Sequence, residues 1–154
     1  MEISLEEKIS EKYHGQEKGM TILPNNYLSN DKEEFHSTTL SFYKYAKSKM
    51  EIEYVTEPEI LIEQRSGDWF GPVLMFTSIA LRENPALISI ACSVIANFVT
   101  DFLKGEKKQN IRLKVLYKET KSTKITEICY EGGLEGLASL EKSILEVASK
   151  SSDE

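Results

Sequence analysis

Two histidines and two cysteines are the residues of this chain best suited to metal binding or nucleophilic catalysis. His14 and His36 are far apart in sequence, and neither has a second ligand at the spacing of a metal site. Cys92 lies in an apolar stretch and is expected to be a small buried residue. Cys129 lies near the end of a predicted strand, with no histidine close to it in sequence. The sequence therefore predicts no metal, no cofactor and no catalytic residue, and a protein that is not an enzyme.

A glycine-rich segment and a group of carboxylates are two further candidates for chemistry. Residues 131–136 read Glu-Gly-Gly-Leu-Glu-Gly between a predicted strand and a predicted helix, where phosphate-binding loops occur. Their spacing matches neither the dinucleotide fingerprint nor a P-loop, and the two glutamates would repel phosphate. The carboxylates at 51, 53, 57, 59 and 63 are expected on solvated strand faces. Neither pattern predicts a catalytic site.

Charge is distributed unevenly along the chain, whose net charge is −6. Residues 51–100 contain seven acids and two bases, whereas residues 104–124 contain eight bases and two acids. A basic hairpin of this kind can contact phosphate, but the bases lack a pattern of interleaved aromatic residues, with Tyr117 alone among them, and the whole protein is acidic. Nucleic acid is therefore not the expected partner. One interpretation is that the basic strands pair beside the acidic ones, where opposite charges across strands are favourable.

The residues proposed for partner binding come from two segments. Trp69 and Phe70 lie beside glycines and a proline in an apparent aromatic turn, and tryptophan is common at binding hot spots. Packing under the domain is the other interpretation of this turn. Four bases of the predicted hairpin complete the set: Arg112, Lys114, Lys118 and Lys121.

One segment, residues 85–104, predicts a helix that is apolar around most of its circumference. Such a helix lies in a core, between subunits or in lipid. Residues 84–100 carry no charge, but 17 residues are at the lower limit for spanning a bilayer. The core position is preferred, with membrane contact as a minor alternative. Because one sheet face would not easily cover this much apolar surface, a homo-oligomer is expected.

Hydrophobic periodicity predicts an α+β fold with about four mostly antiparallel strands packed on helices. Residues 51–55 and 59–63 alternate as strands, and residues 111–117 and 124–130 form a predicted hairpin. Helices are expected at about 31–49, 72–81, 85–104 and 134–149. The first opens with a capping box, and the third follows an Asn-Pro pair and ends at a glycine.

Length and composition predict one domain in a reducing compartment. The chain has 154 residues, 40% of them hydrophobic and 29% charged. Residues 1–30 are expected to form a polar arm, residues 31–150 the domain and residues 151–154 a loose tail. Two cysteines give no disulfide framework, and the charged first residues lack the pattern of a secretory signal. A cytoplasmic location is expected.

Residues 85–150 resemble small effector-associated accessory components of bacterial conflict (defence) systems. The shared pattern is an apolar helix, a basic link at 104–108, a hairpin ending in Cys-Tyr-Glu-Gly at 129–132, and a helix with leucines at 134, 137 and 140. It covers less than half of the chain and transfers no site residues. The resemblance implies a non-enzymatic protein-binding adaptor in bacterial defence. Two alternatives stay open: an acidic immunity or inhibitor protein that binds a basic partner through residues 51–68, and an effector that associates with membranes through residues 85–104.

Overall fold

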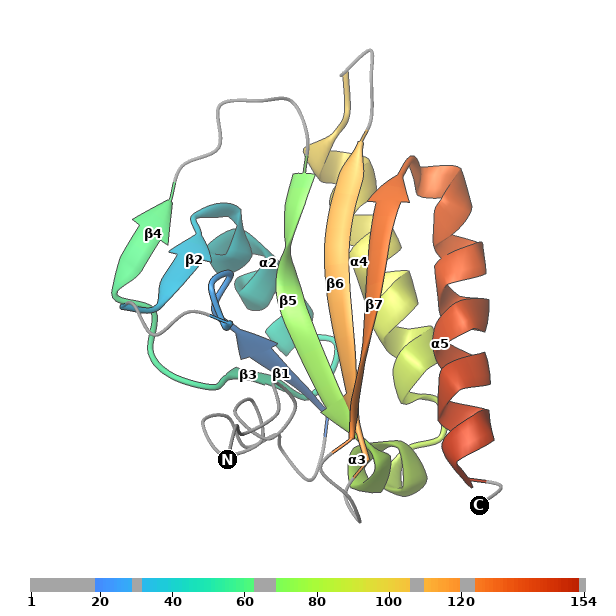
Figure 1. The fold of residues 1–154 in the computed structure, drawn as a ribbon. Helices are drawn as coiled ribbons and strands as arrows, with labels where there is room; N and C mark the ends of the chain where they lie inside the picture. The colour runs from blue at the N-terminus through green and yellow to red at the C-terminus, as the bar shows by residue number, and fades with distance from the viewer. Residues whose placement is uncertain (1–18, 29–31, 63–68, 106–109, 120–123, 153–154) are drawn as a thin grey trace.

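The computed structural model describes residues 19–28, 32–62, 69–105, 110–119 and 124–152 (Figure 1). Their main feature is a five-stranded sheet in the order β3-β1-β5-β6-β7. The five strands are β1 (Met20–Leu23), β3 (Ile52–Tyr54), β5 (Trp69–Thr77), β6 (Ile111–Lys118) and β7 (Ile125–Gly132). A second sheet pairs β2 (Glu34–His36) with β4 (Ile60–Ile62). The helices are α2 (Thr38–Lys47), α3 (Ser78–Glu83), α4 (Leu87–Phe102), α5 (Leu137–Ser152) and the short 3-10 turn η1 (Leu134–Gly136).

The class of fold, a combination of helices and sheet, agrees with the sequence prediction, but the sheet itself does not. Parallel pairing joins β1 to β3, β5 to β6 and β2 to β4, whereas β1–β5 and β6–β7 are antiparallel. The prediction of about four mostly antiparallel strands is therefore wrong. It failed because the two strands predicted at 51–55 and 59–63 belong to different sheets, and because three other strands, β1, β2 and β5, were missed.

The most consequential missed strand is β5, which includes the predicted aromatic turn and most of the helix expected at 72–81. Its apolar run from Trp69 to Phe76 is typical of a strand buried on both faces. The Gly71-Pro72 pair, interpreted as a break, lies in a bulge, where the register with β6 shifts between Phe70 and Val73. A bulge tolerates proline because it leaves a residue outside the hydrogen-bonded ladder. The helix begins only after the strand, at α3, whose first turn is capped by the Thr77 hydroxyl accepting from the Ala80 amide.

The chain before β3 also differs from the prediction of one helix over 31–49. Residues 34–36 form β2, and the helix α2 begins at Thr38. The part of the predicted arm that the structure describes includes β1, which lies inside the main sheet between β3 and β5. Residues 1–18 and 153–154 lie outside the described residues. The remaining elements agree closely with prediction: the β6–β7 hairpin, α4 and α5.

Helices α2, α4 and α5 cover one face of the main sheet and form the principal core with it (Figure 1). Trp69 is fully buried at its centre, with its ring centroid 5.8 Å from that of Phe42 on α2 and 5.9 Å from that of Phe98 on α4. Most of the apolar circumference of α4 is covered within the chain, and Phe102 is its one large apolar residue that is more than 40% exposed. Within the described residues, no helix has the length and apolar character needed to cross a bilayer.

The position of α4 bears on the expected homo-oligomer. That expectation rested on uncovered apolar surface, and the sheet, α2 and α5 supply the cover. The core interpretation of this helix is the one that the packing supports. The homo-oligomer remains a prediction, but most of the apolar surface on α4 that suggested it is covered within the chain.

We expect Trp69→Ala to destabilise the protein by about 3–5 kcal/mol, because it leaves a cavity between β5, α2 and α4. Leu61→Ala is the matched control, since Leu61 is 43% exposed on β4 and should change stability by less than about 1 kcal/mol. Urea denaturation followed by circular dichroism measures both. Equal effects of the two substitutions would contradict the central position of Trp69.

Candidate functional site

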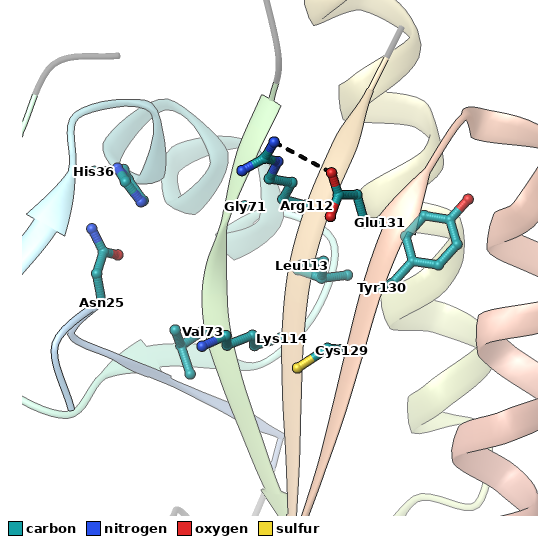
Figure 2. Close-up of a pocket in the computed structure, with 10 residues that line it drawn as sticks. All are labelled: Asn25, His36, Gly71, Val73, Arg112, Leu113, Lys114, Cys129, Tyr130 and Glu131. Carbon is teal, nitrogen blue, oxygen red and sulfur yellow. Dashed lines mark ion pairs between the residues drawn. The ribbon is translucent and has the colours of Figure 1, made fainter. Parts of the chain in front are cut away.

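A groove of about 330 Å³ lies on the face of the main sheet opposite the helices, and we call it the open-face groove. Figure 2 shows its lining from β1–β2 on one side and β5, β6 and β7 on the other. Its polar lining side chains are those of Asn25, His36, Arg112, Lys114, Cys129 and Glu131, and Gly71, Val73, Leu113 and Tyr130 complete the lining. The groove therefore combines residues from both sheets, and it contains bases, a carboxylate and a thiol.

Two rows of opposite charge run along β6 and β7 on this face. Antiparallel pairing sets Arg112 opposite Glu131 and Lys114 opposite Cys129, with Glu127 next along β7. The Arg112 Nη2 atom lies 3.3 Å from Glu131 Oε1, and the Lys114 Nζ atom lies 3.8 Å from Glu127 Oε1 (Figure 2 shows the first pair). The two basic side chains are 49% and 45% exposed, so solvent and partners can reach them. We call Arg112, Lys114, Glu127 and Glu131 the charged face.

Tyr27 contacts the charged face and also belongs to a small second hydrophobic core on the same side of the main sheet. It is buried with Leu23, Val73, Met75, Leu116 and Ile125. The Lys114 ammonium lies 5.8 Å from the centre of the Tyr27 ring, within the range of a cation–π contact. Burial, and then the charge of Glu127, raise the pKa of Tyr27 well above its usual value. The phenol is therefore neutral at physiological pH, and its ring contacts Lys114 without adding charge.

The wall of the groove opposite the charged face comes from the turn after β1 and from β2. The backbone N–H of Asn25 donates to the backbone carbonyl of Glu34 at 2.7 Å. The Asn26 side-chain oxygen accepts from the backbone N–H of Glu34 at 2.9 Å. These bonds hold the small sheet against the end of β1. Asn25 Nδ2 is buried without a hydrogen-bond partner in the described part of the chain. Burial lowers the pKa of His36, so its imidazole is neutral near pH 7.

The six residues proposed for partner binding fall into different places. Arg112 and Lys114 share one face of β6, as their alternation along the strand predicted, and both line the groove, which was not predicted. Lys118 is half-buried at the far end of β6, opposite Ile125, and does not line the groove. Trp69 is 0% exposed and packs against α2 and α4, so in this structure it supports the core and offers no surface contact. Phe70 belongs to β5, and Lys121 lies outside the described residues.

Sequence reasoning missed the acidic row and the far wall of the groove. The hairpin register would have revealed the row, since pairing residue 111 with 132 sets Glu131 opposite Arg112. No local pattern identifies Asn25 or His36, because both depend on pairing between strands distant in sequence. The interpretation that basic strands pair beside the acidic segment is wrong. Strand β6 pairs with β5 and β7, whereas β3 is at the opposite edge of the main sheet and β4 belongs to the small sheet.

The acids of segment 51–59 are divided between the two sheets. Glu53 accepts a hydrogen bond from the Tyr43 hydroxyl at 3.0 Å, beside the main sheet. Glu59 lies 3.7 Å from the Lys32 ammonium, beside the small sheet. A second hollow, of about 390 Å³, lies between α2 and α4 beside Tyr45, Lys49 and the polar stripe of α4. Among the described residues, neither the acidic segment nor the second hollow has opposed rows of charge like those of the charged face.

The chemistry available at the open-face groove is ionic and hydrogen-bonding. Among the described residues, no three histidine, cysteine or carboxylate side chains are grouped so that they could hold a metal ion. The Cys129 thiol donates to Glu127 Oε1 at 3.1 Å. Partial desolvation, that hydrogen bond and the charge of Glu127 raise the pKa of the exposed Cys129 thiol, while Lys114 opposes the shift. The thiolate is therefore disfavoured near neutral pH, and the arrangement suits recognition better than nucleophilic attack.

No family model, curated protein or solved structure matches the chain. The resemblance of residues 85–150 to effector-associated components thus remains a hypothesis. Any proposal for function rests on the open-face groove and the charged face.

The two cysteines should react differently with a thiol reagent at about pH 8. Burial, and then the charge of Glu141, raise the pKa of Cys92 to about 12, so it should react only when the protein unfolds. Cys129 is exposed and should react in the folded protein, and Glu127→Gln should accelerate it by removing the carboxylate charge. Absorbance after adding Ellman's reagent follows both, with Cys129→Ser as the control. Equal rates for the two thiols in the folded protein would contradict this arrangement.

Proposed function

We propose that this chain is a non-enzymatic protein-binding module whose contact surface is the charged face beside the open-face groove. One observation carries the proposal: two rows of opposite charge lie on adjacent strands, half exposed, next to a hollow that a side chain of a partner can enter. Surface ion pairs contribute only about 0–1 kcal/mol each to stability. The fold therefore depends little on these four residues.

Charges arranged in rows have a larger effect on association than on folding. Complementary charge steers the encounter of two proteins and penalises a wrong partner or a wrong orientation. Salt weakens this effect, since exposed charges are screened over about 8 Å at physiological ionic strength. The proposal thus assigns partner choice and orientation to the charged face, and affinity also to contacts within the groove.

The two alternative functions receive less support from the geometry. An inhibitor acting through residues 51–68 would need its acids on one surface, whereas Glu53 and Glu59 lie beside different sheets. A membrane-associating effector would need exposed apolar surface on α4, which is mainly buried. A role in bacterial defence rests on the resemblance of residues 85–150 and would be tested by the genes that accompany this one.

We expect exchange of the two rows to slow association with the partner strongly while preserving the fold. The variant R112E/K114E/E127K/E131K keeps opposite charges facing each other across β6 and β7 but inverts the pattern that a partner meets. The native partner, isolated with the wild-type chain as bait, should associate with this variant at least about tenfold more slowly at low salt.

A matched control is the variant K44E/K142E/E83K/E146K, which reverses two bases and two acids at exposed positions outside the charged face. It should bind the partner at the wild-type rate. Circular dichroism and denaturation verify the fold of both variants. Wild-type binding and salt dependence in the row-exchanged variant would refute the charged face as the contact surface.

A further inference from the structure

Strand β7 is the edge of the main sheet on the side of the charged face. Its inner side pairs with β6 over eight consecutive positions, from Ile111–Gly132 to Lys118–Ile125, without a bulge. In the part of the chain that the structure describes, no strand pairs with its outer side. An edge of this kind presents backbone N–H and C=O groups at alternate residues, which can pair with another extended chain.

Three features that commonly protect an edge strand, a proline, a lysine and a bulge, are absent from β7. It contains no proline and no lysine, and its register with β6 is regular. Its two glutamates could repel an incoming strand, but Glu127 and Glu131 are held toward the bases of β6. The helix α5 lies beside β7 at the outer side of the sheet, so the helix layer continues to this edge (Figure 1).

We propose that β7 accepts an extended segment of the protein partner as a sixth strand of the main sheet. This inference rests on the proposed protein-binding function and specifies its mode and the chemistry of the partner. On the face of the groove, β7 presents Glu127, Cys129 and Glu131, so an added strand is favoured by lysine or arginine at alternate positions. On the helix side it presents half-buried Ile128 and Tyr130, so the intervening positions are apolar.

The resulting order of charge is basic on β6, acidic on β7 and basic on the partner strand. A second copy of this chain fits less well. Antiparallel pairing of β7 with itself about Cys129 sets Glu127 opposite Glu131 of the other copy, and like charges directly opposite are destabilising. Pairing about Ile128 avoids that contact but still provides no basic side chain for either glutamate.

The test uses three short synthetic peptides with the full-length protein. The first alternates lysine and valine, and the second alternates glutamate and valine. The third is the lysine–valine peptide with N-methyl groups on the backbone amides that would face β7. The third keeps the charge and side chains but cannot complete the backbone ladder. Binding is measured by calorimetry, and amide hydrogen exchange by NMR reports which strand becomes protected.

We expect the lysine–valine peptide to bind and to slow exchange at alternate β7 amides by about tenfold or more, because those amides gain hydrogen-bond partners. Amides of β3, at the opposite edge, should be unaffected. The other two peptides should bind at least about tenfold more weakly, and E127K/E131K should reverse the preference between lysine and glutamate peptides.

Three outcomes would overturn strand addition. One is equal binding of the methylated peptide, which would show that charge alone is recognised. Another is binding without protection of β7. The third is protection of β7 in the free protein together with a dimer mass by light scattering, which would identify a second copy as the occupant. Each is distinguishable from failure of the proposed function, since the row-exchanged variant tests the charged face with the native partner independently of β7 pairing.

Discussion

The parallel pairing of β5 with β6 is the constraint on which the rest of the structure depends. Two parallel neighbours cannot be joined by a tight turn, so the chain must cross from the end of β5 back to the start of β6. That crossover contains α3 and α4, and it places α4 against Trp69, Leu74 and Phe76 on one face of the sheet. The antiparallel turn into β7 and the return along α5 then extend the same helix layer.

Placing all three long helices on one face gives the two faces of the sheet different roles. The helix side supplies most of the buried apolar area, including the contacts among Trp69, Phe42 and Phe98. The other side needs only a small apolar cluster near Tyr27, so exposed charged side chains are tolerated along β6 and β7. The charged face is thus a consequence of which side the crossover takes.

Local patterns predicted the elements that are regular and close in sequence. The hairpin and the two long helices follow from alternation and from apolar stripes, and the same alternation placed Arg112 and Lys114 on one strand face. The strand β5 was not predicted because Gly71-Pro72 is typical of a break in regular structure. In the fold a bulge accommodates this pair. Gly71 fits there because the side chains of Leu113 and Trp69 approach it too closely for a Cβ atom.

The parts that were not predictable depend on pairing over long sequence distances. Nothing near β1 indicates that it lies between β3 and β5, because its four residues are too few for a clear alternation. The groove shares this limitation, since Asn25 and His36 reach it only through the bonds that fix the small sheet to the end of β1. The acidic row could have been inferred from the hairpin register. That Asn25 and His36 lie across the groove from this row could not have been inferred from the sequence.

The position of β1 also has a kinetic consequence. The carboxyl-terminal elements from β6 to α5 follow one another in sequence and pack in that order, so little chain entropy is lost in bringing them together. By contrast, β1 pairs at Met20 with Ile52 and at Thr21 with Met75, across long connections. Contacts between distant segments slow folding, because the loops must close before the pairing is formed. We therefore expect insertion of β1 between β3 and β5 to limit the rate at which the chain folds.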